Sequence, residues 1–132
     1  LLAVILGARP EGFLLMKDPE SIRPIVDYHM MRVCLRTGLV RIENPELKER
    51  IASRRWVDPT EEVSIRQATE RAIQGLVEHT GCSVAAIDGL FFKIGRSHCV
   101  ETAEPRCAEC PLEARCAKET TLFQPVFRTT AY

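Results

Sequence analysis

Residues 99–116 read CVETAEPRCAECPLEARC, and this stretch holds four of the chain's six cysteines: Cys99, Cys107, Cys110 and Cys116. Seven residues separate the first two of these cysteines, two separate the second and third, and five separate the last two. Such short spacings allow one loop to wrap a metal centre with every thiolate directed inward. We therefore expect a metal-binding loop at residues 99–116.

Several kinds of site can use such a cysteine cluster. A disulfide framework suits a small secreted domain, but no stretch has the pattern of a signal peptide, so we expect a protein that is not secreted. A zinc site usually has two Cys-x-x-Cys pairs, whereas this chain has one, Cys107-Ala-Glu-Cys110, with a single cysteine on either side. This asymmetry favours a [4Fe–4S] cluster, in which each iron binds one thiolate. Zinc remains the alternative, with His98 as a possible substitute for Cys99.

The composition is that of an ordinary globular protein, with 45% apolar residues and a formal net charge of zero over 132 residues. A neutral chain has no overall field that would draw it to a membrane surface or to nucleic acid. No stretch approaches the roughly 20 apolar residues that span a bilayer, so we expect no membrane partner. The chain opens on the apolar run LLAVIL, and we expect that a further N-terminal portion precedes Leu1.

Start and stop signals predict four helices between residue 24 and the cysteine loop, at residues 24–37, 44–54, 58–79 and 83–95. Upstream, residues 1–7 read as the end of an apolar helix and residues 12–17 as one helical turn. We expect an extended strap rather than a helix after Ala117, because Pro125 would interrupt a helix there. We place Trp56 and the phenylalanines in the core, and we expect Cys34 and Cys82 to be small buried side chains. The apolar stripes of the helices should form the core: Val26, Met30, Val33 and Thr37; Ile65, Ala68, Ala72, Ile73 and Leu76; Val84, Ile87, Leu90, Phe91 and Ile94.

These elements predict an all-α protein in three parts. Residues 1–98 form a helical region, residues 99–116 the metal loop, and residues 117–132 the tail.

Asp27 is the only acidic residue between Arg23 and Arg41. It falls in the first turn of the predicted helix at residues 24–37, where free backbone N–H groups and the helix dipole favour a carboxylate. Arg32 and Arg36 lie four residues apart on the same helix. A basic stripe beside one carboxylate suits a phosphate-binding surface, because guanidinium groups match phosphate oxygens. A capping acid beside a solvated helix face is the plainer alternative.

Two segments together resemble the endonuclease III-type DNA glycosylases of the helix-hairpin-helix superfamily. VDYHMMRVCLRTG, at residues 26–38, is similar to VDTHIFRVCNRT in that family, and GRSHC with the three following cysteines is similar to its GRYTC segment and cluster loop. The resemblance implies a helical DNA-glycosylase-like domain that acts on double-stranded DNA in base-excision repair. It places the catalytic carboxylate on Asp27 and a [4Fe–4S] cluster on Cys99, Cys107, Cys110 and Cys116.

In such enzymes the damaged base is flipped out of the duplex into a pocket. The carboxylate then activates the nucleophile or stabilises the positively charged sugar. The cluster shapes a loop that meets DNA phosphates, a role that Arg106 and Arg115 could fill here beside Arg32 and Arg36. The family's glycine-rich hairpin, whose lysine performs the lyase reaction, is not present between Leu1 and Asp27. Either it precedes Leu1 or this lineage lacks it, so the resemblance implies base removal and leaves strand cleavage undecided.

Two other hypotheses remain at this stage. One is a non-catalytic iron–sulfur protein that binds nucleic acid on the same scaffold, and the other is an iron–sulfur electron carrier. We expect a monomer, located in the cytoplasm with the nucleoid, or in the nucleus of a eukaryote.

Overall fold

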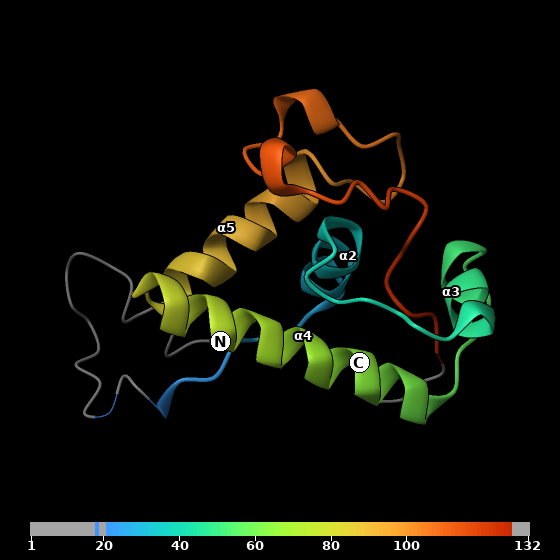
Figure 1. Ribbon diagram of the computed structural model, residues 1–132, viewed down its shortest axis with the longest axis horizontal. Coiled ribbons are helices and arrows are strands. Elements are labelled where there is room, and N and C mark those ends of the chain that lie inside the picture. The colour runs from blue at the N-terminus through green and yellow to red at the C-terminus, as the bar shows by residue number, and fades with distance from the viewer. Residues whose placement is uncertain (1–17, 19–20, 128–132) are drawn as a thin grey trace.

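The computed structural model describes residue 18 and residues 21–127, and within them the fold is all-α (Figure 1). The predictions for residues 1–17 lie outside the described residues. In the described part no β-sheet forms, and one isolated bridge joins Trp56 to Val126. None of the helices in this part is both long enough and apolar enough to cross a bilayer. The elements are α2 (Tyr28–Thr37), α3 (Pro45–Ala52), α4 (Pro59–Thr80), α5 (Val84–Ser97) and the 3-10 turns η2 (Cys107–Glu109) and η3 (Glu113–Arg115).

The helices begin at side chains that cap free backbone N–H groups. At the start of α3 the side-chain oxygen Oδ1 of Asn44 accepts from the N–H of Glu46 at 2.9 Å. At the start of α5 Ser83 Oγ accepts from the N–H of Ala86 at 3.2 Å. These starts confirm the predicted helices. The predicted start of the first helix at residue 24 is wrong: Asp27 has an extended backbone, with ψ at −178°, and α2 begins only at Tyr28.

Helix α2 lies in the middle of the molecule in Figure 1, with α5 to its upper left, α4 below it and the cysteine loop above. Every residue of α2 from Met30 to Arg36 is buried. A helix buried on all sides needs close neighbours, and Gly95 of α5 provides one such contact. A Cβ at residue 95 would lie 3.1 Å from His29 Cβ, so the glycine lets the two helices approach closely.

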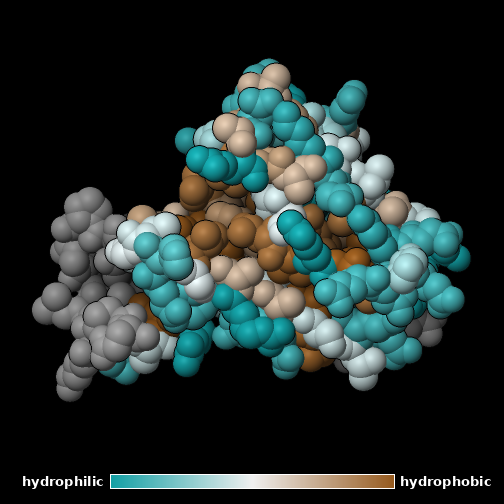
Figure 2. Space-filling model, in the orientation of Figure 1, coloured by the Kyte–Doolittle hydropathy of each residue, from teal (hydrophilic) through white to brown (hydrophobic). Residues whose placement is uncertain are grey.

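Ile73 of α4 and Phe91 of α5 are buried as predicted, but Leu90 of the predicted α5 stripe is 40% exposed. Phe92 and Cys82, which were also predicted to be buried, are exposed. Trp56 is not in the core, because it lies in the connection between α3 and α4 and its side chain is 57% exposed. The apolar side chains of α4 and α5 are also left uncovered on one side. Figure 2 shows apolar side chains gathered between α4, α5 and the cysteine loop, where a groove of about 720 Å³ is lined by residues such as Leu90 and Leu112.

The tail runs back across α2 without a helix in its described part, residues 117–127, as predicted for a strap. Ala117 N–H donates to Thr37 O and Glu119 N–H donates to Arg36 O, each at 3.0 Å, so the tail pairs with the free carbonyls at the end of α2. Gly38 ends the helix with φ at 81°, and a Cβ there would lie 2.8 Å from Ala117 Cβ. The glycine therefore permits both the left-handed backbone and the close passage of the tail.

Candidate metal centre and carboxylate site

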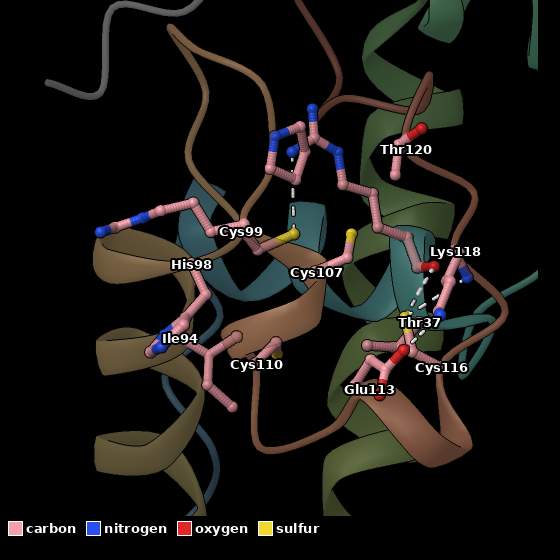
Figure 3. A pocket seen from close by; sticks show the side chains of 13 residues that line it. Thr37, Ile94, His98, Cys99, Cys107, Cys110, Glu113, Cys116, Lys118 and Thr120 are labelled. Atoms are coloured by element: carbon pink, nitrogen blue, oxygen red, sulfur yellow. Dashed lines mark hydrogen bonds and ion pairs between the residues drawn. The ribbon is translucent and has the colours of Figure 1, made fainter.

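The four clustered cysteines line one cavity of about 30 Å³ (Figure 3). Cys99 follows α5, Cys107 begins η2, and Cys110 and Cys116 directly follow η2 and η3. Each 3-10 turn closes on a cysteine: Cys110 N–H donates to Cys107 O at 3.1 Å, and Cys116 N–H donates to Glu113 O at 3.4 Å. The loop thus brings all the predicted ligands to the same cavity.

Two N–H groups are directed at cysteine sulfurs. The backbone N–H of Lys118 lies 3.3 Å from Cys116 Sγ, and Arg36 Nη1 lies 3.7 Å from Cys99 Sγ. Burial raises the pKa of the Cys99 thiol, while the hydrogen bond from Arg36 acts in the opposite direction. Because metals bind thiolates, donors of this kind favour the form of cysteine that a metal needs.

The donor set can be compared with the two candidate metal centres. Among the described residues, no three His, Cys, Asp or Glu side chains are grouped closely enough to hold a single metal ion. A zinc ion needs four ligands at about 2.0–2.3 Å from one point, so the cysteines are not arranged as a ready tetrahedral site. In a [4Fe–4S] cluster each thiolate binds a different iron, and a set of four cysteines with N–H donors to sulfur suits that chemistry.

To bind a [4Fe–4S] cluster, the cysteine loop would also need enough space. The cavity has room for about one or two water molecules, so the loop has to spread to hold four irons. His98 lines the same cavity, and its Nδ1 atom is buried without a hydrogen-bond partner among the described residues. This buried nitrogen is therefore a polar atom that no described residue satisfies.

Arg32 is not on the surface, where a phosphate-binding role would place it, because only 1% of it is exposed. Its Nε donates to Cys99 O at 2.9 Å and its Nη2 to Gly95 O at 2.9 Å. Its Nη1 donates to the Gln124 side chain of the tail at 3.1 Å. The guanidinium joins α2, α5 and the tail, and this burial argues against the predicted DNA contact of Arg32.

Arg36 is likewise buried, with 2% exposure, and its burial argues against the predicted DNA contact in the same way. Its Nε donates to Leu122 O at 2.6 Å and its Nη1 to Val100 O at 2.8 Å. The guanidinium carbon of Arg36 lies 4.7 Å from the centre of the Phe123 ring, and that of Arg54 lies 4.3 Å from the same ring centre. A buried arginine needs several acceptors, and backbone carbonyls of the loop and tail supply them here.

Arg106 and Arg115 are exposed on the cysteine loop, where a phosphate could reach them. Arg106 donates to Ser97 O and lies 3.8 Å from the Glu109 carboxylate. Their contact with DNA stays a prediction. Acidic residues of the loop are also paired: Glu101 with Arg32 and Arg54, and Glu113 with Lys118 at 2.7 Å.

Asp27 caps the N-terminus of α2 rather than lying in its first turn. Its Oδ1 accepts from Met30 N–H at 2.8 Å, and its backbone carbonyl accepts from Met31 N–H at 3.0 Å. The side chain is partly exposed, and the other oxygen, Oδ2, has no hydrogen bond to any residue that the structure describes. The helix therefore orients the carboxylate while leaving one oxygen available.

The environment of Asp27 includes two groups that the sequence did not single out. Asp88 of α5 has a pKa raised by burial and by the nearby charge of Asp27. The segment before Asp27 is held by Arg66 of α4, which donates to Val26 O. Arg66 is in turn paired at 2.5 Å with Glu62, which is only 3% exposed.

The cavity and the carboxylate lie at opposite ends of α2. At about 1.5 Å per residue, the nine steps from Asp27 to Arg36 span roughly 14 Å. A metal centre at the cysteines would therefore not touch a substrate at Asp27, and its influence on that end would pass through the buried helix.

Comparisons with family models, with curated proteins and with solved structures give no match for this chain. The resemblance to the endonuclease III-type family therefore stays a prediction from the sequence.

Proposed function

We propose that this protein is a base-excision repair glycosylase that hydrolyses the N-glycosidic bond of a damaged or mismatched base in double-stranded DNA. The observation that carries the proposal is the direct contact between the two segments that resemble the family. Arg32, in the Asp27 segment, donates to the backbone carbonyl of Cys99 at 2.9 Å, although 67 positions separate these residues. One rigid unit thus presents a capped carboxylate at one end and four clustered cysteines at the other.

The proposed reaction breaks the bond between C1′ of the sugar and the nitrogen of the base. The bonding electron pair leaves with the base, and positive charge develops on the sugar. The Asp27 carboxylate stabilises that charge or accepts a proton from the water whose oxygen bonds to C1′. The products are a free base and an abasic site. Because Oδ1 is held by the backbone, the carboxylate needs little reorganisation during the reaction.

Cys99, Cys107, Cys110 and Cys116 are the residues that would hold a [4Fe–4S] cluster. Bound there, the cluster would crosslink the loop through its iron–thiolate bonds. Arg106 and Arg115 on the same loop are exposed, and in this proposal they contact DNA phosphates. The proposal covers base removal and leaves strand cleavage undecided.

The proposal is tested by base release from duplex oligonucleotides that each carry one altered pair, such as uracil opposite guanine, thymine glycol opposite adenine or adenine opposite 8-oxoguanine. The parent protein is expected to release a base from at least one of them. Asp27→Asn keeps a good N-cap residue and is expected to slow release by about 100- to 10,000-fold, with DNA binding retained. Asp58→Asn is the matched control, because Asp58 caps α4 away from this site.

Two results would contradict the proposal. Equal release by the parent and Asp27→Asn would remove the catalytic role of Asp27. DNA binding without release from any duplex would favour a non-catalytic iron–sulfur protein that binds nucleic acid.

A further inference from the structure

An exposed group of aromatic rings lies beside Asp27. Tyr28, the first residue of α2, is 50% exposed, and Phe92 of α5 is 44% exposed. The His29 ring lies between them, 4.1 Å from the Tyr28 ring at a tilt of 36° and 5.4 Å from the Phe92 ring, edge to face. Single exposed aromatic residues are common, but three connected rings next to a half-buried carboxylate form a surface of defined chemistry.

The position and the charge of the His29 ring are both set by its neighbours. Arg32 Nη2 lies 3.0 Å from His29 Nδ1. Arginine has only donors, so Nδ1 accepts and the ring proton is on Nε2. Burial also lowers the pKa of His29, which keeps the imidazole neutral near pH 7. The close approach of His29 to Gly95 holds the ring against α5, and the group is therefore preorganised.

A cation borders the rings. The Arg96 side chain is exposed, and its guanidinium lies 5.5 Å from the centre of the Phe92 ring. Exposed ring faces with a guanidinium over one of them complement a nucleotide, which has a π-face joined to a phosphate. An apolar protein partner would not require the cation, and a lipid would not require ring faces.

We infer that Tyr28, His29 and Phe92 form a stacking platform for an unpaired nucleobase of DNA, with Arg96 contacting a neighbouring phosphate. This inference rests on the proposed function in that it takes DNA as the partner. It does not require Asp27 to be catalytic. An extruded base on the platform would bring its sugar close to the carboxylate.

The test is binding of a fluorescent single-stranded oligonucleotide, followed by fluorescence anisotropy. Base–aromatic stacking is worth about 1–3 kcal/mol per base, so Tyr28→Ala and Phe92→Ala should each weaken binding by about 5- to 150-fold. Tyr28→Phe keeps the ring and should bind within about twofold of the parent. Trp56→Ala is the control, because Trp56 is an equally exposed aromatic residue outside this group.

Unchanged binding by Tyr28→Ala and Phe92→Ala, an equal loss in Trp56→Ala, or no binding by the parent would overturn the inference. Base release measured on the same variants separates this inference from the proposed function. If the parent releases a base but the ring variants bind DNA as tightly as the parent, the platform is rejected and the glycosylase proposal stands. If binding depends on the rings but the parent releases no base, the glycosylase proposal is rejected and the platform stands.

Discussion

Two pairs of arginines have opposite environments in this protein. Arg32 and Arg36 on α2 are almost fully buried, and their donors are bonded to backbone carbonyls of the loop and tail. Arg106 and Arg115 on the cysteine loop are exposed. The comparison shows that the role of an arginine depends on the acceptors that the fold brings to it. The buried pair fastens the loop, and the exposed pair lies at the surface, where a partner can reach it.

The largest expected effect is on the buried pair. Arg36→Met keeps much of the side-chain volume but leaves Leu122 O and Val100 O without their donor. We expect a loss of about 3 kcal/mol or more in the free energy of unfolding, measured by urea denaturation, since hydrogen bonds to charged groups are worth about 1.5–3 kcal/mol each. Arg115→Met is the control and should change stability by no more than about 0.5 kcal/mol. Equal losses would break the comparison.

A smaller effect is expected where the tail passes α2. Gly38 and Gly81 both have positive φ, at 81° and 68°, but only Gly38 has a neighbour, Ala117 Cβ, where its Cβ would be. Gly81→Ala should cost about 1 kcal/mol, the ordinary penalty for the left-handed backbone. Gly38→Ala should cost at least about 1 kcal/mol more, because the tail has to move. Identical thermal midpoints for the two variants would show that the tail does not need this close contact.

The burial of His29 makes the stability of the protein depend on pH. Burial lowers the pKa of His29 from its usual 6.5, so the unfolded chain takes up a proton first as the pH falls. The free energy of unfolding should therefore decrease as the pH falls below about 6.5. His29→Gln should show a shallower decrease in urea titrations over this range. A slope that is unchanged in His29→Gln would assign the pH dependence to other groups.

The smallest effect on stability is expected for the exposed pair. Arg106→Ala and Arg115→Ala should each leave the free energy of unfolding within about 0.5 kcal/mol of the parent. If they contact phosphates, each should lower the slope of log affinity for DNA against log salt concentration by about one. Unchanged slopes, measured by fluorescence anisotropy, would leave the cysteine loop without a role in DNA binding.

The helices could be predicted because their signals are local. Asn44, Asp58 and Ser83 mark three starts, and Gly38 and Gly81 mark two ends. The cysteine cavity was also predictable, because short spacings restrict where the thiols can lie.

The buried arginines were not predictable from the helix pattern. Their acceptors come from residues 95–124, which only the tertiary fold brings to α2. For the same reason the sequence did not indicate Phe123 beneath Arg36, or the Glu62–Arg66 pair that holds the segment before Asp27. Of these, only the spacing of four between Glu62 and Arg66 on one helix was a visible signal.

The central claim is that the buried arginines fasten a loop whose four cysteines hold an iron–sulfur cluster. The most direct test is the absorbance spectrum of protein purified without air, with iron, sulfide and zinc analysis. The account predicts a brown protein with a broad band near ~400 nm and about four irons and four sulfides per chain. A colourless protein that contains one zinc ion, or no metal, would contradict it.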